Sequence, residues 1–312
     1  MTEVDEMTTS DVYAELRPLV FSIAYRMLAS VSEAEDIVQE AFLRYHRTLS
    51  EGTQVESPRA FLSTVTTRLS IDHGRSARAR RETYVGEWLP EPLLTDASAP
   101  DPARHAEDAD SLSMAFLLVL ERLSPVERAV FLLREVFAYD FDEIAKIVGK
   151  SEPNCRQLGV RARRHVAEGK PRFEASRVER QELATRFFAA LGEGDMDDLV
   201  GLLAGDVVVH GDGGGNGPSW GRPIVGRANV ARLMHGLGEQ MRELAIEIRQ
   251  VEINGQPGAL VFAPDGRLTN VFSLDIADDA VQVIRSVINP DKLRHLGPLA
   301  DVRALRRGRD PK

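Results

Sequence analysis

The sequence predicts a multidomain chain in which two all-α modules are followed by an α+β domain with a curved antiparallel sheet. Apolar residues recur at helical spacing through most of residues 10–82 and 110–170, and a proline-rich linker separates these stretches. After Pro171 the pattern changes to short helices followed by four runs of alternating or β-branched residues, which is typical of helices packed on one antiparallel sheet. A length of 312 residues is enough for two or three such domains.

Composition and charge limit the possible functions. Hydrophobic residues make up 43% of the chain, but no apolar run reaches the roughly 20 residues that span a bilayer. The first residues, MTEVDEM, have neither the basic nor the apolar part of a signal peptide. The single cysteine, Cys155, fits a reducing cytoplasm as a small core residue, with a redox-sensing thiol as the alternative. Seven scattered histidines predict no metal site, and no cofactor or membrane partner is expected.

The first module, residues 10–82, is predicted to contain three helices. They run from about Val12 to Ala29, from near Ser32, and from Pro58, with a polar loop over residues 48–57 before the third. The third helix leads into a basic segment that holds one aspartate against six arginines: Arg59, Arg68, Arg75, Arg78, Arg80 and Arg81. Because local potential governs phosphate binding, this segment is compatible with nucleic acid despite a net charge of −9.

The second helix of this module has a compact polar face opposite an apolar one. The apolar face comprises Ala34, Ile37, Val38, Ala41, Phe42 and Tyr45. The polar face comprises Glu35, Asp36, Gln39 and Glu40. Taken by itself, this pattern is typical of a solvated helix surface.

Residues 83–109 form a linker rich in proline, which keeps such a segment extended and fairly stiff. The motif WLPEP, Trp88 to Pro92, is unusual in a linker because solvated segments rarely expose tryptophan. We therefore expect Trp88 and Leu89 to dock on another part of the chain.

The second module, residues 110–170, ends in a predicted helix-turn-helix between Asp140 and Val166. Asp140 and Glu143 form a capping box, and Gly149 supplies the left-handed end of the first helix. Ser151 is placed to cap the second helix. The outward face of the second helix carries Asn154, Arg156, Gln157, Arg161 and Arg164. These side chains suit a recognition helix in the major groove, and an ordinary basic amphipathic hairpin is the alternative.

The third domain, residues 178–293, is predicted to begin with a helix around Phe187 that is closed by Gly192 or Gly194. A short helix to Leu203, a strand over Asp206 to His210 and a helix over residues 229–241 follow. Four strands then alternate with Asn-Gly, Asp-Gly and Asp-Asp turns. Residues 294–312 form a basic tail that is expected to be loose.

Two motifs, in the right order and at the right spacing, resemble bacterial extracytoplasmic-function RNA polymerase sigma factors. AEDIVQEAFLR, within Met27 to Arg47, resembles their second conserved region, and FDEIAKIVGKSEPNCRQLGVRARR resembles their fourth. The rest of the chain resembles a SnoaL-like (NTF2-type) domain. WLPEP, DGGG (Asp212 to Gly215) and NPDKL (Asn289 to Leu293) together resemble the SigJ-type group, in which such a domain is fused to the sigma factor.

The resemblance implies an alternative sigma factor that binds core RNA polymerase, through its β′ clamp helices and β flap, and directs promoter-specific transcription. Asp36, Gln39 and Glu40 would bind the polymerase, and the loop over residues 48–57 would capture an unstacked −10 base. The resemblance assigns −10 DNA to Arg59, Arg68, Arg75 and Arg78. It assigns −35 DNA to Ser151, Asn154, Arg156, Gln157, Arg161 and Arg164.

The resemblance also implies that the C-terminal domain controls the sigma factor within the same chain, so that no separate anti-sigma factor is expected. The interdomain regulatory residues would be Trp88, Leu89, Pro90, Asp212, Gly213, Gly214, Asn289, Pro290, Asp291 and Lys292. Asp212 can equally bond its own glycine turn.

Two other functions remain open at this point. The C-terminal domain could bind or turn over a small molecule, and His210, Asp212 and His235 would then be the candidate acid–base residues. We assign no catalytic residue and expect no enzyme activity. A conventional repressor would explain the helix-turn-helix, but it would leave the first module without a role.

Overall fold

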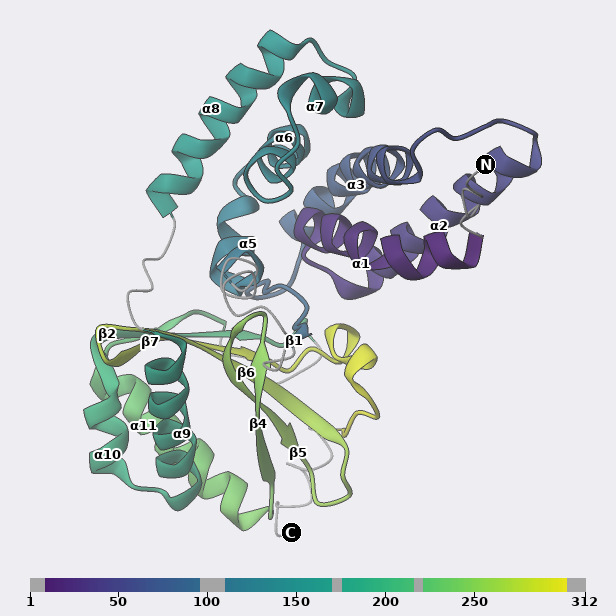
Figure 1. Cartoon of the computed structure of the whole chain (residues 1–312). Coiled ribbons are helices and arrows are strands. Elements are labelled where there is room, and N and C mark those ends of the chain that lie inside the picture. The colour runs from purple at the N-terminus through teal and green to yellow at the C-terminus, as the bar shows by residue number, and fades with distance from the viewer. Residues whose placement is uncertain (1–8, 96–109, 170–175, 216–220, 302–312) are drawn as a thin grey trace. The chain divides into compact units, whose positions relative to one another are not determined.

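The computed structural model describes residues 9–95, 110–169, 176–215 and 221–301 (Figure 1). The described residues fall into two compact units, one from Met1–Glu82 and Val119–Lys170 and the other from Thr83–Leu118 and Pro171–Lys312. The two predicted helical modules thus share the first unit, and the linker belongs to the unit that contains the C-terminal domain. Among the described residues, no helix combines the length and apolar character needed to cross a bilayer.

Three helices form the amino-terminal part of the first unit: α1 (Thr9–Leu28), α2 (Val31–Ser50) and α3 (Pro58–Glu82). The predicted polar loop begins three residues later than expected, because α2 continues through Ser50. The Thr48 and Ser50 hydroxyls donate to carbonyls four residues earlier, so these polar side chains bond within the helix. The buried core between the helices consists of Val12, Leu16, Val20, Val38, Ala41, Tyr45 and Leu62.

After the linker, the described residues include the helices α5 (Met114–Leu120), α6 (Pro125–Glu135), α7 (Phe141–Val148) and α8 (Glu152–Gly169). The capping box at the start of α6 is present, with the Ser124 hydroxyl accepting from the Glu127 amide and the Glu127 carboxylate accepting from the Ser124 amide. The core beneath α7 and α8 consists of Val130, Leu133, Tyr139, Ile144, Ile147, Cys155 and Leu158.

In its described residues, the C-terminal domain packs α-helices against a sheet (Figure 1). The helices are α9 (Arg177–Glu193), α10 (Met196–Leu202) and α11 (Arg227–Glu243). Gly194, with φ 79°, closes α9, as one of the two predicted alternatives proposed. Buried aromatic and aliphatic side chains of the helices and one sheet face form the main core, which includes Phe187, Phe188, Val209, Met234, Phe272 and Ile284.

The seven-stranded sheet has the order β1-β4-β5-β6-β7-β2-β3. Its strands are β1 (Leu94–Thr95), β2 (Leu203–Asp212), β3 (Ile224–Val225), β4 (Glu247–Ile253), β5 (Gln256–Phe262), β6 (Leu268–Ala277) and β7 (Ala280–Val287). The predicted α+β architecture is confirmed, although β2 pairs in parallel with β7, so the sheet is antiparallel except for this pair. The predicted strand at Asp206 to His210 is longer and ends at Asp212. The linker itself supplies β1, which pairs with β4.

Candidate functional site

The helix-turn-helix forms as its local signals predict. The Asp140 amide donates to the Glu143 carboxylate at 2.9 Å, and Gly149 ends α7 with φ 67°. Helix α8 begins directly after Ser151. Cys155, Leu158, Ala162 and Val166 are buried. All six residues assigned to −35 DNA are exposed: Ser151, Asn154, Arg156, Gln157, Arg161 and Arg164. Burial raises the pKa of the Cys155 thiol, which agrees with the core interpretation of this residue.

The arginines of α8 are paired with carboxylates in the free chain. Arg156 bonds Glu152 one turn earlier, and its guanidinium lies 4.9 Å from the centre of the Phe141 ring. Arg164 pairs with Glu168 at 3.2 Å. These are exposed pairs of modest strength, so phosphates can replace the carboxylates at small cost. Sequence reasoning missed Phe141, the first residue of α7, as the ring on which Arg156 lies.

The polar face of α2 is exposed at Asp36 and Gln39, while Glu40 is half-buried and pairs with Arg44 at 2.7 Å. Leu43 lies on the same face, three residues after Glu40, and is 44% exposed. An exposed leucine beside carboxylates is a mixed surface of the kind that protein interfaces use. The signal was present in the sequence, as an apolar residue at a polar position of the helix.

The arginines assigned to −10 DNA differ in their surroundings. Arg59 and Arg75 are exposed, and Arg75 pairs with Asp72 at 3.1 Å. Arg68 instead donates from Nε to the Ile147 carbonyl at 2.8 Å, and from a terminal nitrogen to the Lys146 carbonyl at 2.9 Å. The side chain of Arg78 lies outside the described residues.

Asp212 is the centre of the contact between the linker and the C-terminal domain. Its side chain is fully buried at the end of β2. The carboxylate accepts hydrogen bonds from the Tyr84 hydroxyl, from the Leu89 amide at 2.8 Å and from the Gly214 amide at 3.1 Å. The ammonium of Lys292 lies 2.6 Å from the same carboxylate. Asp212 therefore does bond its own turn, as the sequence allowed, and it also holds the linker.

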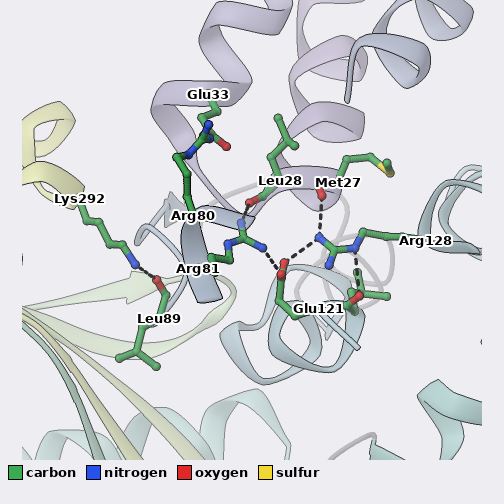
Figure 2. Close-up of polar contacts among 10 residues, drawn as sticks. Met27, Leu28, Glu33, Arg80, Arg81, Leu89, Glu121, Arg128 and Lys292 are labelled. Atoms are coloured by element: carbon green, nitrogen blue, oxygen red, sulfur yellow. Dashed lines mark hydrogen bonds and ion pairs between the residues drawn. The ribbon is translucent and has the colours of Figure 1, made fainter. Parts of the chain in front are cut away.

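Lys292 also contacts the linker. Its buried ammonium donates to the Leu89 carbonyl (Figure 2) and lies 4.9 Å from the ring centre of Tyr84 and 4.3 Å from that of Trp88. Such cation–π contacts strengthen when the cation is desolvated. Burial raises the pKa of Tyr84, and its hydrogen bond to Asp212 raises the pKa further, so the phenol remains a donor. We call Tyr84, Trp88, Leu89, Asp212 and Lys292 the linker clamp.

The two short motifs of the C-terminal domain, DGGG (Asp212 to Gly215) and NPDKL (Asn289 to Leu293), contact each other next to the linker clamp. The side-chain amide of Asn289 donates to the Tyr84 hydroxyl at 2.7 Å. Gly214 has φ 59°, and any Cβ there would collide with the Asn289 side chain, so only glycine fits. Pro290 opens a short 3-10 helix that presents Lys292. Asp291, by contrast, pairs at the surface with Arg294 at 2.6 Å and lies outside the linker clamp.

Further contacts extend this docking along the linker. Glu87 accepts from the Gly211 amide at 3.2 Å and lies 2.8 Å from a ring nitrogen of His210. Leu93 and Asn254 exchange hydrogen bonds, one from the Leu93 amide to the Asn254 side chain and one from the Asn254 amide to the Leu93 carbonyl. Leu89, Pro90 and Gly213 are buried, and Leu89 packs with Met114, Ile253, Val271 and Val287.

The three candidate acid–base residues all have structural partners. His210 and Asp212 contact linker residues, as described above. His235 lies 3.6 Å from Glu239 on its own helix, α11. Sequence reasoning missed Tyr84, Glu87 and Asn254, because nothing local marks a residue whose partner is far along the chain.

The chain matches three protein-family models in the order that the fold shows. They are sigma-70 region 2 over residues 12–80, sigma-70 region 4 over residues 113–166 and a SnoaL-like domain over residues 184–287. The chain is 37% identical over 306 residues to the ECF RNA polymerase sigma factor SigJ of Mycobacterium tuberculosis, covering 95% of this chain and 96% of that protein. It is 31% identical to the probable ECF RNA polymerase sigma factor SigI of the same species, over 89% and 92% of the two chains.

The crystal structure of Mycobacterium tuberculosis SigJ superposes with a TM-score of 0.71 and 35% identity, covering 92% of this chain and 99% of that one. The chain belongs to the extracytoplasmic-function RNA polymerase sigma factors that carry a fused C-terminal SnoaL-like domain. It is a promoter-specificity subunit of RNA polymerase.

Proposed function

We propose that this sigma factor is controlled within its own chain, by the C-terminal domain acting through the linker clamp rather than by a separate anti-sigma factor. The observation that supports the proposal is the buried Asp212–Lys292 pair. Asp212 accepts a hydrogen bond from the Leu89 amide, and Lys292 donates one to the Leu89 carbonyl. The linker joins the polymerase- and −10-binding module to the −35-binding module. A domain that fixes the linker therefore limits how far these modules can separate.

The proposal uses three helices of the first unit. Helix α2 would bind core polymerase through Asp36, Gln39, Glu40 and the neighbouring Leu43. Helix α8 would bind the −35 duplex, with Arg156 and Gln157 reading bases and Arg164 contacting phosphate. Helix α3 would follow the −10 strand. Small-molecule turnover by the C-terminal domain gains no support from His210 and Asp212, because both are used in contacts with the linker.

The test is transcription from one cognate promoter by holoenzyme made with full-length variants. Lys292→Met should release the linker and raise output severalfold, because the two DNA-binding modules would gain access to the promoter spacing. Arg294→Met is the matched control, since it removes a nearby cation that pairs only at the surface. Equal output from both variants and the wild type would refute control through the linker clamp.

A further inference from the structure

A valine lies in the middle of the outward face of α8. The side chain of Val160 is 65% exposed, whereas Leu158 and Ala162 on the opposite side of the helix are buried. At 3.6 residues per turn, Val160 falls on one line with Gln157, three residues earlier, and Arg164, four residues later. Val160 is therefore an apolar position inside the polar face of the helix.

The stability of α8 does not explain this residue. Valine loses side-chain freedom in a helix, and it is a weaker helix former than alanine. The core beneath α8 is formed by residues on the other side of the helix, and Val160 does not pack with them. Its methyl groups gain burial when a partner covers the outward face of α8.

The side chains around Val160 identify the partner as DNA. Arg156 and Arg161 lie on either side of Val160, and both are exposed. Guanidinium groups bind phosphates, and the amide of Gln157 matches the hydrogen-bonding edge of adenine. With the cations at its margins, the centre of this face meets the base edges in the major groove.

The major groove presents one apolar group that suits such a side chain. Thymine carries a C5-methyl group there, whereas the other bases present mainly hydrogen-bonding atoms. Because valine has no side-chain donor or acceptor, Val160 can select a base only by burying an apolar group. The restricted χ1 of valine in a helix also means that little side-chain freedom is lost on binding.

The helix geometry places the thymine next to the base that Gln157 reads. The two residues are three positions apart, which is about 4.5 Å along the axis at 1.5 Å per residue. Successive nucleotides of a DNA strand are about 3.4 Å apart. The side chains of Gln157 and Val160 therefore reach neighbouring base pairs.

We propose that Val160 reads a thymine of the −35 element by packing on its C5-methyl group, at the base pair next to the one that Gln157 contacts. This inference rests on the proposed binding of the −35 duplex by α8 and adds a residue that determines its specificity. Gln157 selects by hydrogen bonds, Val160 selects by apolar contact, and Arg164 binds phosphate.

Selection from a promoter library with a randomised −35 element tests the proposal. Holoenzyme is made from core polymerase and full-length wild type, Val160→Ala or Gln157→Ala. The wild type should enrich thymine at one position, and Val160→Ala should lose this preference alone. Gln157→Ala should lose the preference at the adjacent base pair. Alanine is the better helix former, so Val160→Ala keeps α8 folded.

Removing the methyl group from the DNA is the complementary measurement. Uracil pairs as thymine does and lacks only the C5-methyl group. Uracil at the enriched position should weaken wild-type binding about fourfold, the effect of burying one carbon group less. Val160→Ala should bind both promoters equally, because its contact is already absent. Val178→Ala is the matched control, since Val178 is 67% exposed on α9, and this variant should keep the penalty for uracil.

Three results would each overturn the proposal. They are a selection without thymine beside the Gln157 position, equal wild-type binding to the thymine and uracil promoters, and a uracil penalty that persists in Val160→Ala. An equal loss of affinity for all sequences in Val160→Ala would also overturn it, because that result indicates contact with phosphate or polymerase. Failure of −35 binding by α8 shows separately, since the wild-type holoenzyme would then enrich no base in the randomised element.

Discussion

Replacing Lys292 by methionine should detach the linker while leaving the C-terminal domain folded. Methionine keeps the length of the lysine stem but removes the ion pair with Asp212, the hydrogen bond to the Leu89 carbonyl and the cation–π contacts with Tyr84 and Trp88. Removing one partner of a buried ion pair typically costs about 3–5 kcal/mol. Asp212 keeps three other donors, so we expect the lower end of this range.

A loss of about 3 kcal/mol makes opening of the linker roughly 100-fold more frequent, since 1.4 kcal/mol corresponds to a factor of about ten. Hydrogen exchange measures this directly, because the Leu89 amide is bonded to Asp212 in the docked state only. Protection of this amide should fall by about two orders of magnitude in Lys292→Met.

Two further variants make the measurement specific. Arg294→Met should change protection of the Leu89 amide by less than about fivefold, because its pair with Asp291 is exposed. The double variant Asp212→Asn/Lys292→Met should lose less than the sum of the single losses, because no buried charge is left alone. Unchanged protection in Lys292→Met would show that the buried pair does not hold the linker.

Three more outcomes follow from the described contacts. Burial opposes ionisation of Glu121, but Arg128 and Arg81 outweigh it and lower the pKa of this carboxyl below 4.5. The ionised Glu121 carboxylate therefore stabilises the folded state above pH 4.5, and this stabilisation is lost as the pH falls through the lowered pKa. The deficit of Glu121→Gln in urea unfolding should shrink in acid, and a pH-independent deficit would contradict the assignment. Arg156→Ala should cost about 1–3 kcal/mol and relax one −35 base preference, whereas Arg164→Ala should weaken all sequences alike in binding assays over a salt series; identical losses would refute this division. Asp36→Lys/Glu40→Lys should abolish co-purification with core polymerase at unchanged helical circular dichroism, and retained binding would exclude this face.

The sequence by itself determined the fold class of each module, the ends of its helix-turn-helix and the side chains of α8 that are buried. Capping at Asp140, the glycine end at Gly149 and the apolar spacing of α8 all depend on residues within a few positions, and the structure confirms them. The turns between the last strands are similarly local, with Asn254 and Asp278 at positive φ. Short-range signals of this kind can be read from a chain without knowing its fold.

Only the tertiary structure decided which distant residues meet. Lys292 and Leu89 are 203 residues apart, and Asp212 and Tyr84 are 128 apart, so no local pattern could pair them. The sequence likewise presents Arg68 as a free basic residue, whereas packing places its donors on the carbonyl end of α7. Partners of buried polar groups are chosen by the fold as a whole, because each group needs a complementary atom wherever packing excludes water.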